Sequence, residues 1–243
     1  MVYFFSLNDV FRMNKNERFI YEFFHALWIE SDLSAIDRCF SENVLIEGAV
    51  GLAMGTEGKK KIAKEWITAF PCSIGKIERV ISCGEQVSVR WNANARHEGE
   101  FCGVPATGKY FSCLGDCFYH VREMKIVEYR AASTVGAAFA AEGFQLKLPP
   151  RTINYAALVN AARYINNIRF ENREVEVLAL KAAGMSVEKI AVFLHMSYQA
   201  ILDLIWQVLD RLGVTEDEFE MILLHEGTTN IFIKIADILK KAC

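Results

Sequence analysis

The sequence lacks the cysteine patterns that indicate disulfide bonds or bound metal ions. No two of its cysteines have the two-residue spacing typical of zinc and redox sites. The cysteines are also odd in number: Cys39, Cys72, Cys83, Cys102, Cys113, Cys117 and Cys243. In a chain of 243 residues this pattern favours reduced thiols over a disulfide framework. We therefore expect no disulfide, no metal site and no cofactor.

The sequence also lacks a charge excess and a long apolar run. Its formal net charge of −3 gives no general attraction to nucleic acid or to anionic membranes. No apolar run approaches the ~18 residues of a membrane span, and the first residues lack the positive stretch of a secretory signal. Hydrophobic residues nevertheless make up 52% of the chain, which is enough for a substantial core. These features predict a folded cytoplasmic protein.

The first half of the chain has the pattern of helices followed by strands. Apolar residues at helical spacing predict helices over residues 19–28 and around 33–40, with Asn16 as the first cap, and a third helix that is marked by Ile62, Trp66 and Phe70 and ended by Pro71. The three lysines Lys59-Lys60-Lys61 begin the third helix, where we interpret them as a solvated face. The period then changes to two and predicts strands over residues 74–83, 87–97, 109–121 and 125–135. This order predicts an α+β fold in which helices cover one face of a curved sheet.

Two of the four prolines are adjacent, at Pro149-Pro150, and they predict a domain boundary. Strand patterns are absent after them. We therefore predict two domains, residues 1–147 and 151–243, of which the second is all-α. Its expected helices are 153–168, 173–183, 187–194, 198–212, 216–225 and 231–240. Thr215 and Glu218 have the spacing of a capping box, and Gly227 is suited to end a helix.

Three of these helices form a helix-turn-helix pattern between Phe170 and Val214. Gly184 can adopt the left-handed conformation of a tight helix exit, and Ser186 and Ser197 can cap the helices that follow. The segment resembles a LuxR-type helix-turn-helix domain at Arg173-Glu174, Glu176-Val177-Leu178, Gly184-Met185-Ser186, Lys189-Ile190-Ala191, Leu194, Met196-Ser197, Ile201 and Leu212-Gly213-Val214. The resemblance implies a DNA-binding module.

The second helix of this pattern departs from the LuxR type. Members of that family usually expose Lys, Thr, Asn, His or Arg there, whereas this chain has Gln199, Ala200, Leu202, Asp203, Leu204 and Trp206. Residues 170–214 contain four basic and six acidic side chains, so the phosphate neutralisation that DNA affinity requires is weak. Gln199, Leu202, Asp203 and Trp206 are candidate contacts to DNA or to a protein partner. We expect the second apolar face of this helix to be buried against protein.

The first half resembles the SnoaL-like polyketide cyclase family, a branch of the conical α+β folds. The matching residues are Trp28, Asp32, Phe70-Pro71, His97-Glu98-Gly99, Phe101, Gly103-Val104-Pro105, Thr107-Gly108-Lys109 and Lys125-Ile126-Val127-Glu128. The resemblance implies a cone with an apolar cavity and pairing of two copies through their sheets. Strand alternation places Val127, Tyr129 and Ala131 on one wall of that cavity, and Trp91 and His97 are further candidate ligand-binding residues.

The resemblance also locates a missing catalytic group. In the cyclases the Glu of the last strand is followed by a His-Trp-Asp run, whose Asp is the general acid and base. The corresponding position here is Ala131, so we expect no cyclase or isomerase activity. Two side chains are candidate replacements. His97 has a suitable chemistry, although a structural role in the turn is also open, and Asp116 would serve if its side chain faced the cavity rather than solvent.

Together these features predict a ligand-sensing regulator of transcription. The cone would bind a small apolar or aromatic molecule, and the helical domain would carry the output to DNA, in a homodimer without membrane contact. Two alternatives remain open. The output is a protein contact through the apolar second helix, or the protein is a cyclase- or isomerase-like enzyme.

Overall fold

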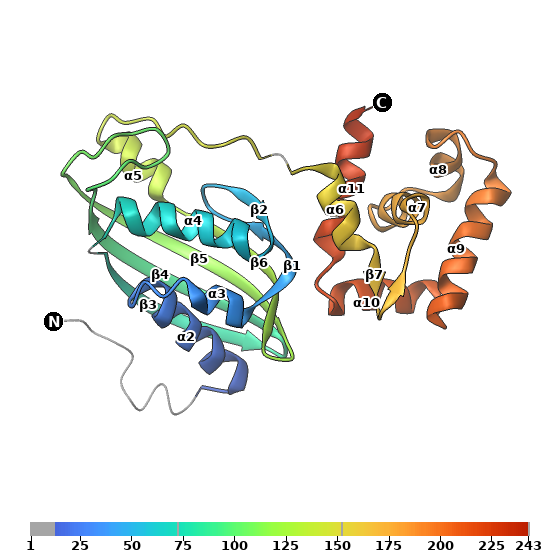
Figure 1. Cartoon of the computed structure of the whole chain (residues 1–243), viewed down its shortest axis with the longest axis horizontal. Coiled ribbons are helices and arrows are strands. Elements are labelled where there is room, and N and C mark those ends of the chain that lie inside the picture. Colours follow the sequence, from blue (N-terminus) through green and yellow to red (C-terminus); the bar gives the residue numbers. More distant parts are fainter. Residues whose placement is uncertain (1–12, 72, 152, 243) are drawn as a thin grey trace. The chain divides into compact units, whose positions relative to one another are not determined.

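The protein forms two compact units, residues 1–152 and 153–243, which are described separately here. The computed structural model describes residues 13–71, 73–151 and 153–242 (Figure 1). The first unit mixes helices with a curved sheet, and the second is almost entirely helical.

The first unit is a six-stranded sheet with helices across one face (Figure 1). Its helices are α2 (Lys15–Trp28), α3 (Ser34–Cys39), α4 (Gly55–Ala69) and α5 (Val135–Ala141). Its strands are β1 (Phe40–Glu47), β2 (Leu52–Met54), β3 (Ile74–Cys83), β4 (Gln86–Arg96), β5 (Tyr110–Arg122) and β6 (Lys125–Ser133). The strand order is β2-β1-β6-β5-β4-β3, and β1 is parallel to β6 while the other pairs are antiparallel. The predicted α+β architecture of this half is confirmed.

One local prediction for this unit is wrong, and two of its strands were not predicted. The cap of α2 is Asn14, whose side chain accepts from the Glu17 amide at 3.0 Å, while Asn16 donates to the Gly84 carbonyl. Strands β1 and β2 were not predicted. Strand β1 has an irregular register against β6 and buries Val44, Leu45 and Ile46 in succession, so it lacks the alternation that identifies a half-buried strand.

The interior of this unit consists of two apolar clusters. The larger one lies where α2, α3 and α4 meet the sheet and includes Phe23, Phe40 and Tyr119. The smaller one lies around α5, where the rings of Phe111 and Phe139 stack with centroids 4.1 Å apart. The first cluster borders the cavity described below, so its packing positions the candidate site.

The second unit contains α6 (Tyr155–Ala162), β7 (Tyr164–Ile165), β8 (Ile168–Arg169), α7 (Asn172–Ala182), α8 (Val187–Phe193), α9 (Tyr198–Leu212), α10 (Glu216–His225) and α11 (Thr229–Ala242). The helix predicted over residues 153–168 is too long, because α6 ends at Ala162 and a small hairpin follows. Asn166 and Asn167 both have positive φ, at 49° and 62°, which suits a two-residue hairpin turn.

Several predicted helix ends are confirmed in this unit. Thr215 and Glu218 form a capping box at the start of α10, and Gly227 adopts a left-handed conformation just beyond its end. The Ser197 hydroxyl accepts from the Ala200 amide at 3.1 Å and caps α9. Ser186 precedes α8 without a side-chain cap to a backbone amide.

Among the described helices, none has by itself the length and apolar character to cross a membrane. Only the strongly bent pair of α8 and α9, taken together, has a matching length and composition.

Candidate functional site

The first unit contains a cavity between the concave face of its sheet and helices α2 and α4. Its volume is about 140 Å³. Most of the lining is aromatic and aliphatic, with Trp28, Trp66, Phe70, Trp91 and Tyr129 among the rings. A cavity of roughly this size with an apolar lining can hold a molecule such as benzene. The space therefore fits a small organic ligand with about one aromatic ring.

One lining residue, Lys59, is a buried amine. Its side chain is only 2% exposed, and Nζ lies 3.7 Å from the centre of the Tyr129 ring. The rings of Trp28 and Phe40 follow at 5.6 and 5.8 Å. Burial lowers the pKa of Lys59 to about 8, and the neighbouring Cys117 opposes this shift. The faces of the rings favour the ammonium ion, whereas the lack of water favours the neutral amine.

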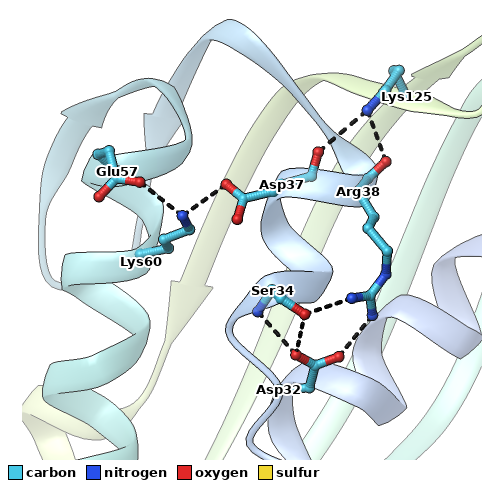
Figure 2. Close-up of polar contacts among 7 residues, drawn as sticks. All are labelled: Asp32, Ser34, Asp37, Arg38, Glu57, Lys60 and Lys125. Carbon is cyan, nitrogen blue, oxygen red and sulfur yellow. Dashed lines mark hydrogen bonds and ion pairs between the residues drawn. The ribbon is translucent and has the colours of Figure 1, made fainter.

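The interpretation of the three consecutive lysines as a solvated face is wrong for Lys59. Figure 2 shows the neighbouring Lys60 directed at two carboxylates, Glu57 and Asp37, each at 2.7 Å. Consecutive helical residues point about 100° apart, so when Lys60 faces the outside Lys59 can face the cavity. The sequence did carry a signal, because Lys59 precedes Ile62 and Trp66 by three and seven residues and so belongs to their apolar stripe.

Polar contacts around α3 hold the start of α4 in place (Figure 2). Lys60 joins α4 to Asp37 of α3, and Lys125 of β6 donates to the backbone carbonyls of Asp37 and Arg38. Arg38 in turn pairs with Asp32 at 2.7 Å, and hydrogen bonds from Arg38 and Ser34 lower the pKa of that carboxyl to about 2. These links orient the first turns of α4, from which Lys59 extends.

A second nitrogen in the cavity wall has no hydrogen-bond partner among the described residues. It is the buried Nε1 of Trp91, a residue that the sequence analysis proposed as a cavity wall. The Trp91 ring lies against Gly115 on the neighbouring strand, where a Cβ atom would overlap it. Glycine at position 115 is therefore what allows the indole to lie flat against the sheet.

Of the three residues predicted to form a wall on β6, Tyr129 and Ala131 line the cavity and Val127 does not. The Tyr129 hydroxyl lies 3.7 Å from the Cys117 sulfur. Between His120 and Val121 the pairing of β5 with β6 shifts by one residue, which leaves Val127 without a partner. Because this bulge breaks the alternation, Ile126 rather than Val127 joins the core with Tyr129.

Neither candidate for a replacement base reaches the cavity. Asp116 is on the outer face of the sheet, 58% exposed, in a two-pronged ion pair with Arg90 at 2.8 Å. His97 is fully buried among Phe70, Phe111 and Phe139, and its Nδ1 lies 3.2 Å from the Thr107 hydroxyl. Burial lowers the pKa of His97. Its position, bonded to the turn and outside the cavity lining, is that of a structural histidine.

The face of β5 opposite Asp116 carries Cys113 and Cys117, which line the cavity, and Tyr119, which is in the core. Burial raises the pKa of the Cys113 thiol to about 11, so it is protonated near neutral pH and a poor nucleophile. Among the described residues, no group of three or more His, Cys, Asp or Glu side chains is placed to hold a metal ion.

The candidate contact residues of the second unit lie on α9. Gln199 and Asp203 are exposed and bonded to one another at 2.8 Å. Trp206 is 58% exposed, Tyr198 is 47% exposed and Leu202 is half-buried. The buried side of α9, with Ile201, Ile205, Val208 and Leu209, packs on α7 and α8. The apolar face formed by Tyr198, Leu202 and Trp206, which we expected to be buried against protein, is therefore not buried within the chain.

The geometry of the first unit is that of a cone-shaped α+β domain with an internal cavity. Residues 18–138 match the SnoaL-like polyketide cyclase family. This part of the chain is therefore similar to a SnoaL-like polyketide cyclase domain.

Solved structures of three bacterial proteins are similar to the chain. A putative polyketide cyclase from Acidithiobacillus ferrooxidans is 18% identical, with a TM-score of 0.48 over 54% of this chain and 95% of that one. AclR, a putative hydroxylase from Streptomyces galilaeus, is 23% identical, with a TM-score of 0.48 over 56% and 98%. IdmH, a putative polyketide cyclase from Streptomyces antibioticus, is 23% identical, with a TM-score of 0.47 over 54% and 100%. No curated protein matches the chain.

Proposed function

We propose that this protein is a ligand-sensing regulator of transcription. Its SnoaL-like domain binds a small, mostly apolar molecule, and its second unit is a LuxR-type helix-turn-helix domain that delivers the output. The observation that carries the proposal is a mostly apolar cavity without the usual acid and base. Ala131 lines that cavity where the cyclases have their Asp, and Asp116 faces solvent.

The second unit supports a helix-turn-helix assignment by its geometry. Helices α8 and α9 are separated by four residues and bend by 113° relative to each other. Helix-turn-helix motifs join their helices by a turn of three to four residues at about 90–120°. The left-handed His195 in the turn and the Ser197 cap fix where α9 begins.

A protein contact is the second candidate for the output, and ion pairs favour it. Three of the four basic residues between positions 170 and 214 are already paired with carboxylates. Arg173 pairs with Glu176, Lys181 with Glu216 and Arg211 with Glu174, at 2.7–2.9 Å. Phosphates would have to compete with these partners, whereas the exposed Trp206 and Tyr198 suit an apolar contact.

DNA affinity against salt concentration separates the two outputs. The full chain is titrated with random-sequence and genomic DNA fragments at several salt concentrations, without and with benzyl alcohol as a cavity probe. We plot the logarithm of DNA affinity against the logarithm of salt concentration. A slope that corresponds to several released counterions, together with an affinity that benzyl alcohol changes, supports a regulator that binds DNA. Affinity without a salt slope, or no binding in either state, rejects the DNA output and leaves the protein contact.

A further inference from the structure

We propose that Lys59 binds the ligand covalently, by condensing its ε-amine with the carbonyl carbon of an aromatic aldehyde or ketone. This inference rests on the proposed ligand binding in the cavity and names the chemical class of the ligand. Nothing in the position of Ala131 or in the SnoaL-like fold requires an amine at this place.

The first argument is the environment of the amine. Lys59 lies on the cavity-facing stripe of α4, and no hydrogen bond or ion pair joins its Nζ to another of the described side chains. Three aromatic rings surround Nζ within 5.8 Å. A buried amine without a carboxylate is costly, and a methionine of similar size would fill the same volume. A lysine here is therefore better explained by its chemistry than by packing.

The second argument is the reactivity of the group. Desolvation in an apolar pocket is one way in which lysines become nucleophiles for imine formation. With its pKa lowered to about 8, Lys59 has a larger fraction of free amine near neutral pH than an ordinary lysine. The fold supplies both conditions at one side chain, which lines the cavity and is only 2% exposed.

The third argument is the rest of the lining. The Trp91 ring belongs to the wall of the same cavity. Trp28, Trp66 and Tyr129 supply further aromatic surface for a ring attached to the carbonyl. The lining thus provides a nucleophile and an apolar, mostly aromatic wall.

The step balances without an oxidant or a reductant. The amine nitrogen adds to the carbonyl carbon, and a proton passes from nitrogen to the carbonyl oxygen. The resulting hydroxyl leaves as water with the second amine proton, and a C=N double bond joins the ligand to Lys59. The reverse hydrolysis releases the ligand, which suits a sensor that must respond to falling concentrations.

Reductive trapping tests the proposal on the full chain. The protein is incubated with benzaldehyde and sodium cyanoborohydride, digested and mapped by mass spectrometry. We expect a benzyl group on Lys59, with about tenfold or more modification than on Lys61, the exposed lysine of the same helix. Denatured protein should lose this selectivity, and Lys61→Met should retain the labelling of Lys59. Equal labelling of Lys59 and Lys61 in the folded protein overturns the proposal.

Benzyl alcohol separates this proposal from the binding on which it rests, because it has the same ring and no carbonyl. A rise in the melting temperature with benzyl alcohol, together with no selective trapping of benzaldehyde, rejects the imine and leaves ligand binding standing. Absence of both effects rejects both proposals. Lys59→Met should still be stabilised by benzyl alcohol, and its helix α4 should show only the background labelling by benzaldehyde that Lys61 has in the wild type.

Discussion

At the scale of single residues, Lys59 combines a cost to stability with a chemical use. Its folded-state pKa of about 8 lies below the ordinary value of 10.5, so the folded protein binds this proton less tightly than the unfolded chain. Protonation therefore favours unfolding. The penalty is complete below about pH 8 and disappears by about pH 10.5, and it amounts to about 3 kcal/mol at about 1.4 kcal/mol per pKa unit.

Lys59→Met should accordingly be more stable than the wild type by up to about 3 kcal/mol at neutral pH. The difference should narrow as the pH rises from about 8 to about 10.5, because the wild type then carries a neutral amine. Urea denaturation of both proteins at several pH values measures it. The partly buried thiols of Cys102 and Cys113, whose pKa burial raises to about 11, should destabilise both proteins to a similar extent at alkaline pH. A pH-independent difference would contradict the buried ammonium.

Gly115→Ala tests the floor of the cavity. The new Cβ would overlap the Trp91 indole, so the ring must move away from the sheet and toward the cavity. We expect a loss of about 1–3 kcal/mol in the free energy of unfolding, together with weaker binding of benzyl alcohol. Gly136→Ala in α5 is the matched control, since nothing lies within 4 Å of its added Cβ. It should leave binding unchanged, and equal effects of both substitutions would rule out the Trp91 contact.

At the scale of elements, α9 has two apolar sides with different roles. Ile205 is buried against the neighbouring helices, whereas Trp206 beside it is exposed. Ile205→Ala should cost about 2–5 kcal/mol, as expected for a buried aliphatic side chain. Trp206→Arg should change the stability of this unit by less than about 0.5 kcal/mol. Chemical denaturation followed by circular dichroism gives both values.

The same pair of variants bears on the partner of α9. If Trp206 contacts a second copy of the chain, Trp206→Arg should reduce the fraction of dimer without unfolding the chain. If it contacts another protein, the variant should bind less of that protein. A destabilisation by Trp206→Arg as large as that by Ile205→Ala, at low protein concentration, would show that the indole is buried within the chain. The expected homodimer can be examined in the same experiment by sedimentation.

At the scale of the whole molecule, each unit has its own core, so we expect two unfolding transitions. Three of the four tryptophans, Trp28, Trp66 and Trp91, belong to the first unit, and Trp206 belongs to the second. In Trp206→Phe, tryptophan fluorescence therefore reports the first unit only. A cavity ligand at a concentration of 100 times its dissociation constant should raise the free energy of unfolding of the first unit by about 2.7 kcal/mol.

Circular dichroism of the same variant reports the helices of both units. Benzyl alcohol should raise the melting temperature of the transition seen by fluorescence. A second transition, seen only by circular dichroism, should keep its melting temperature. One transition, shifted equally in both signals, would mean that the units unfold together and that ligand binding is coupled to the helical unit.

Much of the architecture could be predicted from the residues alone. Helices α9 and α10 and strand β3 have the bounds that their periodicity indicated, because an amphipathic pattern with clear caps depends on local chemistry. Strands β1 and β2 could not be predicted in this way. Strand β1 pairs with the distant β6 in an irregular register and its burial does not alternate, and β2 has only three residues, which is too short for a period to be recognised.

In the candidate site, too, the sequence predicted some features and the tertiary structure decided the others. The sequence alone established that position 131 holds a methyl group, that Trp91 and Tyr129 are ring-bearing wall candidates, and that no acid stands in the usual place. Tertiary structure decided that Lys59 points inward, that Asp116 faces solvent and that a bulge exchanges Val127 for Ile126. A periodic pattern states which residues share a face, but only packing against distant segments determines what that face meets. For Lys59 that partner is the ring of Tyr129, seventy positions along the chain.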